Sequence, residues 1–207
     1  MIPIVPNIED LELKKLMGII GVNSQPIYVV VKPEGNAIVN ECFPNVESKI
    51  KVDGGSQVNG WQIWKTDNLI EAEFHAVWES DAKKLLDITP KPAPFAQILF
   101  IRDDEHSYNG SQVDNIRLNI SGNSLVDDLI TVNESLFIIE NKGSRAFEYE
   151  LKLGGEERKI WEMLQEMKGG LSLMLAKGET KHQVCFCGGS KYKKCHGKLL
   201  PSIKNRL

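Results

Sequence analysis

The chain has 207 residues and a formal charge of −3, with 42% apolar and 26% charged residues, which fits one packed globular domain with a small appendage. No apolar run is long enough to span a bilayer, and the first residues lack the basic and apolar regions of a secretory signal. Three of the four cysteines follow a metal-binding pattern, which argues against a disulfide scaffold and predicts a cytoplasmic protein.

Hydrophobic periodicity divides the first half of the chain into two helices and several strands. We predict helices at 8–20 and 40–52, the second capped by Asn40, and strands at 26–31, 58–64, 69–78, 84–88 and 97–101. Residues 102–123 predict a polar loop, whereas the apolar segment 125–140 fits either a helix or a strand. The last predicted elements are a strand at 145–153 and a helix at 156–177 that breaks at Gly169-Gly170.

This order of elements is typical of an α+β domain with an antiparallel sheet and helices. We place the main domain at 1–177, a polar linker at 178–184 and a small C-terminal zinc-binding module at 185–207. A segment as short as the last one buries too little apolar surface to fold alone. A structural metal ion can supply the missing stability.

The C-terminal module carries a pattern of metal ligands. One residue separates Cys185 from Cys187, and Cys195-His196 follows after seven more residues. Three thiolates and one imidazole form a closed tetrahedral set for zinc, which leaves no position for a catalytic water. His182, in the linker, is an alternative ligand. The pattern therefore predicts a structural Zn²⁺ ion.

Residues 185–197, Cys-Phe-Cys-Gly-Gly-Ser-Lys-Tyr-Lys-Lys-Cys-His-Gly, closely resemble the SEC-C motif. That motif ends the bacterial preprotein translocase ATPase, where it contacts partner proteins, and it also occurs as a tail on many other bacterial proteins. The spacer here is one residue shorter than usual, with Gly188-Gly189-Ser190 where the motif has Gly-Ser-Gly. The resemblance implies that the three cysteines and His196 bind zinc and that the module docks onto a partner protein.

Charge is distributed unevenly along the chain. Residues 181–207 hold seven basic side chains and no acidic one, so residues 1–180 hold 18 basic and 28 acidic side chains. Zinc bound by three thiolates would leave the tail at about +6. A basic tail on an acidic body suits an acidic protein surface, a nucleic acid or an anionic lipid, and a merely solvated surface explains the same pattern equally well.

Cys42 is the cysteine that the metal pattern leaves over. It lies in the first turn of the predicted helix 40–52, where the helix dipole and the free backbone N–H groups favour a thiolate. A cysteine nucleophile also needs a base and a group that orients the base. The sequence therefore has to supply two further residues if Cys42 performs chemistry.

His75 and Asp87 are suited to these two roles. If the turn after strand 69–78 centres on Asp81, then His75 and Asp87 pair on adjacent antiparallel strands and share one face of the sheet. A register slip of one residue would put them on opposite faces. The pattern favours Asp87 as the group that orients the His75 imidazole.

The order of a helix-borne cysteine, a histidine on a strand and an aspartate on the next strand resembles the papain-like fold in its transglutaminase-like form. The resemblance covers about residues 26–101. It rests on His75-Ala76-Val77-Trp78 and Asp87-Ile88-Thr89-Pro90, which are similar to the His-Ala-Trp and Asp-Pro-Thr sequences of that family. Val77 is an extra residue relative to the family pattern.

This resemblance implies that Cys42 is the nucleophile, His75 the general base and acid, and Asp87 the orienting residue. An oxyanion donor is needed as well, and Gln62 and the backbone N–H of Cys42 are the candidates. Alternatively, Cys42 is a small buried apolar residue and His75 a satisfied core histidine. Glu71 and Glu73, close to His75 in sequence, also suggest a weaker alternative, a second metal site.

Two functional classes follow from these residues. The first is a cysteine-dependent hydrolase or acyltransferase that acts on an amide, ester or isopeptide bond, with its zinc tail bound to a protein or ribonucleoprotein. The second is a non-catalytic adapter in which Cys42 is buried. Nucleic-acid binding through the basic tail is a third and weaker hypothesis, and such binding would weaken steeply with salt.

Overall fold

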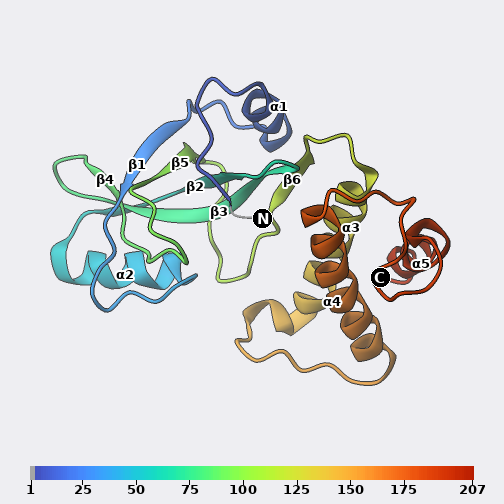
Figure 1. Ribbon diagram of the computed structural model, residues 1–207. Helices are drawn as coiled ribbons and strands as arrows, with labels where there is room; N and C mark the ends of the chain where they lie inside the picture. The colour runs from blue at the N-terminus through green and yellow to red at the C-terminus, as the bar shows by residue number, and fades with distance from the viewer. Residues whose placement is uncertain (1–2) are drawn as a thin grey trace.

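The computed structural model describes residues 3–207, which form a strand-rich part and a helical part side by side (Figure 1). The strand-rich part contains α1 (Leu11–Ile20), β1 (Ile27–Val31), α2 (Cys42–Asp53), β2 (Ser56–Lys65), β3 (Leu69–Glu79), β4 (Leu85–Asp87), β5 (Gln97–Arg102) and β6 (Ile116–Asn119). The helical part contains α3 (Ser124–Glu140), the 3-10 helix η1 (Gly143–Phe147), α4 (Gly155–Ala176), the 3-10 helix η2 (Tyr192–Lys194) and α5 (His196–Lys204). The described chain is thus a mixed α/β protein with five α-helices and one sheet.

The strands do not form the plain antiparallel sheet that the sequence predicts. Their order is β2-β5-β1-β4-β3-β6, and β2 also pairs with β3, so the first five close into a small barrel. β1 and β4 run parallel, and the other pairs are antiparallel. Closure follows from the long hairpin of β2 and β3, because strands of such length twist and bring their outer edges toward each other. Closure also removes edges that an open sheet would expose.

Apolar residues cover both faces of the barrel strands. The inner cluster consists of Val29, Val58, Val77, Ile98 and Phe100, which come from four strands. On the outside, α1 packs Leu13 and Leu16 against strand residues that include Trp61 and Phe74. The second helix, α2, packs Val46 against Ala76 and Trp78 of β3. Burial on both faces explains why β3 is rich in apolar residues instead of alternating strictly along its whole length.

Several sequence predictions in the second half of the chain need correction. Residues 116–119 form the edge strand β6 inside the predicted loop, and the undecided segment 125–140 is helical. The predicted strand at 145–153 is wrong, because only the short helix η1 forms there. Residues 147–152 are exposed, Tyr149 at 90%, so their alternation does not mark a core-facing strand. No helix within residues 3–207 is long and apolar enough to cross a membrane.

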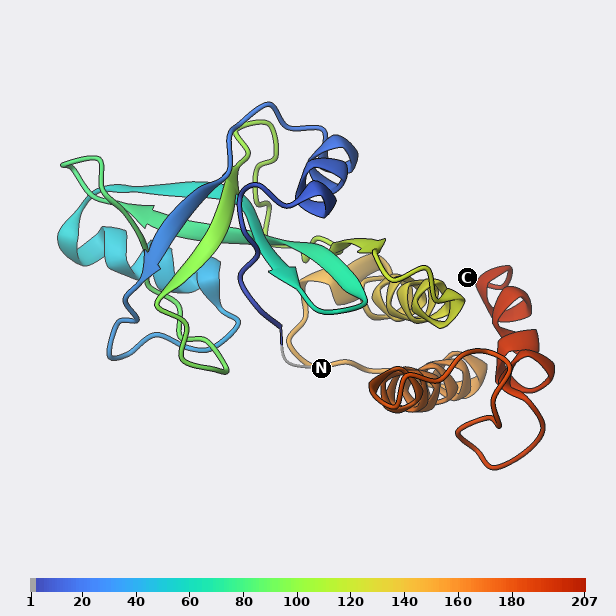
Figure 2. The ribbon, with the colours of Figure 1, turned by 45° about the horizontal axis from the view of Figure 1, so that its top comes forward.

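The C-terminal segment packs against α3 and α4, as Figure 2 shows from a second direction. Its buried residues Cys185, Tyr192, Leu200 and Ile203 belong to the same apolar cluster as the inward faces of those two helices. The limits of the predicted domains stay a prediction. What the packing adds is that the metal-ligand residues share a core with the helical part of the chain.

Helix α4 runs without a break through Gly169-Gly170, where the sequence predicts an interruption. A Cβ atom at Gly170 would lie 2.2 Å from the ring of Phe186. In the sequence Phe186 stands between Cys185 and Cys187. A Cβ atom at Gly169 would meet nothing within 4 Å. Gly170 therefore allows the close approach of residues 185–187 to α4.

Replacing Gly170 with alanine is expected to destabilise the protein relative to Gly169→Ala. Both variants gain the same helix propensity, so the difference between them isolates the collision with Phe186. Overpacking of this kind costs about 1–3 kcal/mol. Denaturant unfolding of the two variants with their metal retained measures the difference, and equal stabilities would contradict the close contact.

Candidate functional site

Cys42 is the first residue of α2, where backbone N–H groups have no partner within the helix. Asn40 does not cap this helix as predicted: Glu41 occupies the cap position, and Asn40 adopts a φ of 65°, in the left-handed region. The turn is fixed instead by Asn45, whose side chain accepts from the N–H of Ile38 and donates to its C=O. Only 8% of Cys42 is exposed.

His75 lies on β3 directly opposite Gly60 of β2. A Cβ atom at Gly60 would lie 2.3 Å from the carbonyl of Ile101 and 2.5 Å from the ring of Phe100, so that only glycine fits there. The imidazole is buried, and its Nε2 lies 3.2 Å from Oδ1 of Asp87. The structure therefore brings together the histidine and the aspartate that the sequence singles out.

Asp87 reaches His75 through a register that differs from the predicted one. The strands β3 and β4 pair Trp78 with Leu86, so the turn centres on residue 82 and Asp87 lies level with Val77. This register is shifted by two residues. Because side chains alternate with a period of two, the shift leaves His75 and Asp87 on the same face.

The Asp87 carboxylate is fully buried, and each oxygen has its own partners. Oδ1 accepts a hydrogen bond from the N–H of Thr89 at 3.0 Å and faces His75, while Oδ2 lies 2.6 Å from Nζ of Lys91. Burial by itself would raise the pKa of Asp87, but His75 and Lys91 outweigh it and hold the pKa below its usual value. The carboxylate is therefore charged at neutral pH.

Burial by itself would lower the pKa of His75. The negative charge of a Cys42 thiolate and the hydrogen-bonded Asp87 carboxylate outweigh the burial and raise the pKa of His75 to about 9. Below that pH the ring is an imidazolium that contacts the Asp87 carboxylate and faces Cys42. Since Nε2 faces Asp87, Nδ1 is the ring nitrogen that remains for the sulfur of Cys42. This arrangement suits a thiolate–imidazolium pair.

Gln62 is buried and lies opposite Glu73 in the β2–β3 ladder. Its Nε2 donates to Oε2 of Glu73 at 3.1 Å, and its Oε1 accepts from Lys91 at 2.6 Å. One N–H of the amide is thus engaged, and the oxyanion role of Gln62 stays a prediction. Glu73 also accepts from the Trp64 indole, and within residues 3–207 no metal-type cluster forms around Glu71 and Glu73.

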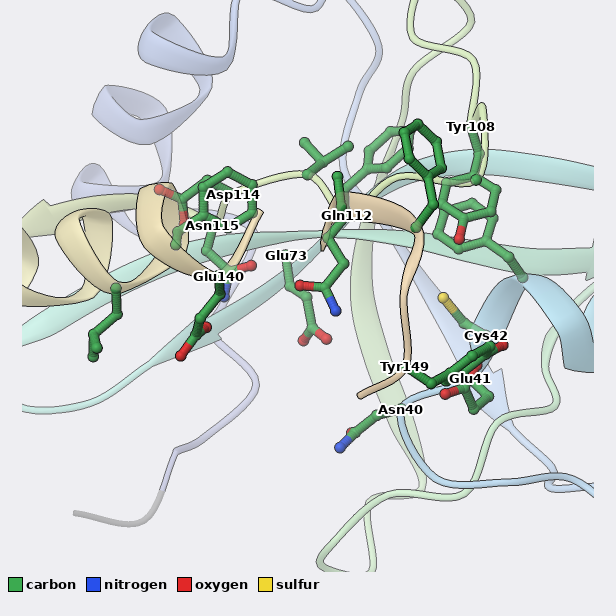
Figure 3. Close-up of a pocket in the computed structure, with 18 of the residues that line it drawn as sticks. Asn40, Glu41, Cys42, Glu73, Tyr108, Gln112, Asp114, Asn115, Glu140 and Tyr149 are labelled. Atoms are coloured by element: carbon green, nitrogen blue, oxygen red, sulfur yellow. The ribbon is translucent and has the colours of Figure 1, made fainter. Parts of the chain in front are cut away.

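Two cavities meet at Cys42. The larger, about 590 Å³, lies between the strand-rich part and the helical part, and in Figure 3 the Cys42 sulfur points toward the space near Gln112 and Tyr149. The smaller, about 300 Å³, is mainly apolar and reaches Cys42, Gln62 and His75 from another side. A substrate could therefore approach the thiol with groups on both sides of the reacting bond.

Negative side chains dominate the larger cavity. Its walls contain the carboxylates of Glu41, Glu73, Asp114, Glu140 and Glu148, and the basic groups of Arg117 and Lys168. The Arg117 guanidinium already binds Glu71 and Asp114, at 3.3 and 2.9 Å. Acidic side chains therefore outnumber basic ones, five to two, on the walls of the cavity in front of Cys42.

Alkylation of Cys42 is expected to depend on the charge of the reagent. For each thiol the rate of alkylation by bromoethylamine, a cation, is divided by the rate of alkylation by iodoacetate, an anion. At low ionic strength this ratio should be several-fold higher for Cys42 than for a free thiol such as N-acetylcysteine. The difference should shrink as salt screens the cavity. Peptide mass mapping of Cys42 measures both rates. A ratio equal to that of the free thiol at every salt concentration would contradict the negative cavity.

The second site is the cluster of Cys185, Cys187, Cys195 and His196, whose ligand atoms all lie within 4.8 Å of one another. Cys185 Sγ lies 3.2 Å from Nδ1 of His196, and the sulfurs of Cys187 and Cys195 are 3.5 Å apart. The alternative ligand His182 is not part of the cluster. These four residues could hold a metal ion.

A tight turn brings the first two ligands together. The N–H of Gly188 donates to the C=O of Cys185 at 2.8 Å, with Gly188 at a φ of 77°, and the N–H of Cys185 donates to the C=O of Ser190. The other two ligands are at the start of α5. Below them the fully buried Tyr192 leaves room only for glycine at 197, where a Cβ atom would lie 2.6 Å from its ring.

Lys91 is the site residue that the sequence analysis missed. Its side chain is 6% exposed and reaches Asp87, Gln62 and His75. The one available signal is local: Lys91 stands between Pro90 and Pro92, four residues after Asp87. A lysine in a proline-rich loop is usually solvated, so this position alone does not indicate burial.

Taken together, the fold and the two sites define a mixed α/β protein with a cysteine–histidine–aspartate constellation beside a small barrel and a C-terminal Cys₃His cluster. No protein-family model, curated protein or solved structure matches the chain.

Proposed function

We propose that this protein is a cysteine-dependent hydrolase or acyltransferase that acts on an amide, ester or isopeptide bond. The observation that carries the proposal is the buried histidine between Cys42 and Asp87, with 3.2 Å between Nε2 of His75 and Oδ1 of Asp87. The thiol borders a cavity of about 590 Å³, which gives a substrate access to it. Nucleophile, base and orienting group are the parts that such a reaction requires.

The proposed reaction has two halves. In the resting site His75 already holds the thiol proton, and the Cys42 thiolate attacks the substrate carbonyl to form a tetrahedral oxyanion. Collapse of this species breaks the bond to the leaving group, which takes the proton from His75, and leaves a thioester on Cys42. Water or an amine then gives a proton to His75 and attacks the thioester. The acid or the new amide leaves, the thiolate is regenerated, and His75 keeps the proton that it took from the nucleophile.

Charge that develops on the carbonyl oxygen needs hydrogen-bond donors. The backbone N–H of Cys42 lies at the N-terminus of α2 and is free of helical hydrogen bonds by its position. We assign it as the first donor. The second candidate is the amide of Gln62, which has an N–H besides the one bound to Glu73.

An activated ester tests this function directly. Incubation with p-nitrophenyl acetate should release p-nitrophenol and leave an acetyl group on Cys42, which intact-mass measurement and peptide mapping detect. The variant Cys42→Ala, with its metal retained, should form no acetyl-enzyme at neutral pH. Equal acetylation of both proteins, or an acetyl group that maps to other residues only, would overturn the role of Cys42.

We propose further that the C-terminal cluster holds zinc in a structural role. Sulfur ligands at the usual zinc distance of 2.3 Å are about 3.8 Å apart in a tetrahedron, close to the spacing of Cys187 and Cys195. Three cysteines and one histidine fill the coordination sphere, so the ion would carry out no catalysis. Thiolate ligands also suit a reducing, cytoplasmic location.

The basic C-terminal segment is proposed to dock onto an acidic protein partner, as its resemblance to the SEC-C motif implies. The non-catalytic adapter and the nucleic-acid binder are the competing functions. The adapter is favoured by the low exposure of Cys42, 8%, and predicts a thiol that labels only after denaturation. Binding of a fluorescent RNA that persists at low salt and vanishes at high salt would favour the nucleic-acid binder instead.

A further inference from the structure

The most unusual group near Cys42 is the buried ammonium of Lys91. Moving an ammonium group out of water costs several kcal/mol unless charged and polar partners replace the water. Lys91 has these partners: Nζ lies 2.6 Å from Oδ2 of Asp87 and 2.6 Å from Oε1 of Gln62. It also lies 3.4 Å from Nε2 of His75. One cation thus touches three residues to which the proposed reaction gives a role.

The two oxygens of Asp87 are divided between two cationic side chains. Oδ1 faces His75 and accepts the N–H of Thr89, while the Lys91 ammonium lies against Oδ2. Without Lys91, Oδ2 would be a buried oxygen without a partner, which favours rotation of the carboxylate away from His75 or its protonation. Either change removes the charged partner of the imidazole.

We propose that Lys91 is a positioning residue of this site, whose ammonium holds the Asp87 carboxylate in the orientation that directs Oδ1 at His75. The proposal rests on the proposed function of Cys42. It adds Lys91 to the nucleophile, the base and the orienting group as a fourth residue of the site. Lys91 acts through Asp87, and no step of the reaction requires it to touch the substrate.

Lys91 has a second effect at Gln62. Because its ammonium binds Oε1, the amide nitrogen of Gln62 must face the other way, where it donates to Glu73 at 3.1 Å. The same cation therefore fixes the direction of the candidate oxyanion donor. The backbone supports this placement, since prolines on both sides of Lys91 restrict the loop.

The charges around His75 distinguish two possible roles of Lys91, because the two roles shift the pKa of His75 in opposite directions. The groups that face the ring are the thiol of Cys42 from α2, the carboxylate of Asp87 from the end of β4, and the ammonium of Lys91 from the following loop. A cation this close opposes protonation of His75, so a purely electrostatic Lys91 lowers the His75 pKa. A positioning Lys91 raises it, because it keeps Asp87 in place. The two roles predict opposite effects of removing the lysine.

The first experiment measures the His75 titration by NMR in protein labelled with ¹⁵N-histidine. In Lys91→Met the titration midpoint of His75 should fall by about one pH unit, a tenfold change in proton affinity, as Asp87 leaves the ring. A midpoint that is unchanged or higher overturns the positioning role. If Lys91→Met does not fold, Lys91→Gln, which keeps a polar side chain of similar length, gives the same comparison.

The wild-type protein supplies a measurement that needs no variant. At pH 7 both nitrogens of His75 should carry a proton, with Nε2–H directed at Asp87. A neutral ring whose bare Nε2 accepts a hydrogen bond from Lys91 would overturn the proposal. Neither NMR result depends on turnover, so the positioning role can fail while Cys42 remains the nucleophile, and it can hold even if no substrate is ever cleaved.

A double-mutant cycle tests whether Lys91 acts through Asp87. The alkylation rate of Cys42 by iodoacetamide at pH 7 should fall about tenfold or more in Lys91→Met and in Asp87→Asn. The double variant should lose little beyond Asp87→Asn alone, since residues that act as one unit are not additive. Losses that multiply would show that Lys91 acts independently of Asp87 and would overturn the proposal.

Discussion

Replacing His75 with alanine is expected to slow the alkylation of Cys42 at pH 7 by about tenfold or more, because an unassisted thiol is only a few per cent thiolate at that pH. In the wild-type protein the pKa of His75 is raised to about 9, so a positive charge stands beside the sulfur at pH 7 and favours its anionic form. The rate of iodoacetamide modification, followed by peptide mass mapping of Cys42, measures the effect. The metal must be retained so that the three ligand thiols stay masked.

The pH dependence gives this prediction its sharpest form. The wild-type rate should exceed that of His75→Ala below about pH 9, where His75 carries its proton, and the two rates should converge as the pH rises above that value. The exposed His182 provides a control, and His182→Ala should follow the wild-type profile. Identical profiles for His75→Ala and the wild type would remove His75 from the site and leave Cys42 as a buried apolar residue.

The ion pair of His75 with Asp87 also makes the stability of the fold depend on pH, in a direction that the two pKa shifts determine. The folded-state pKa of His75 is raised from 6.5 to about 9, so the folded protein binds the proton more tightly than the unfolded chain does. This stabilisation is complete below about pH 6.5 and is lost as the pH rises through 9. The lowered pKa of Asp87 acts at the other end, because its contribution disappears as the pH falls below the usual range of a carboxyl group.

The proximity of His75 to Asp87 can be predicted from the sequence more readily than the barrel can, and the reason is periodicity. A turn centred on Asp81 predicts that His75 pairs directly with Asp87. The observed register is shifted by two residues, so this direct pair does not form, yet a shift of two preserves the face on which each side chain lies. The metal-ligand pattern lies within thirteen residues, so its spacing alone predicts the cluster that the structure shows. Both predictions needed only short-range information.

Lys91 and the barrel depend on contacts that local patterns do not contain. Closure of the sheet needs the pairing of β2 with β5, and the alternation of apolar residues carries no information about which strands are neighbours. Lys91 donates a hydrogen bond to Gln62, which is 29 positions away in the sequence and belongs to another part of the barrel. The helix break predicted at Gly169-Gly170 is wrong for a similar reason. The glycine at 170 accommodates Phe186, which comes from the C-terminal segment and not from the same helix.

Removing the metal is expected to unfold the C-terminal segment and to loosen the helices against which it packs. Cys185, Tyr192, Leu200 and Ile203 contribute to the core of α3 and α4, and without an ion the three thiols and His196 have nothing to hold them together. Hydrogen exchange after chelation should show lost protection in 180–207 and weaker protection in both helices, with recovery when zinc is restored. Unchanged protection of the segment would show that the ion does not hold its structure.

The barrel should respond differently, and this difference separates the two sites. Cys42, His75 and Asp87 all belong to the strand-rich part, so iodoacetamide, which is neutral, should modify Cys42 at the same rate with and without metal. The larger cavity, however, takes Glu140, Glu148 and Lys168 from the helical part. Loosening of that part should therefore reduce the preference for a cationic over an anionic reagent while the intrinsic reactivity of the thiol stays constant. A loss of thiol reactivity on chelation would mean instead that the metal cluster supports the nucleophile itself.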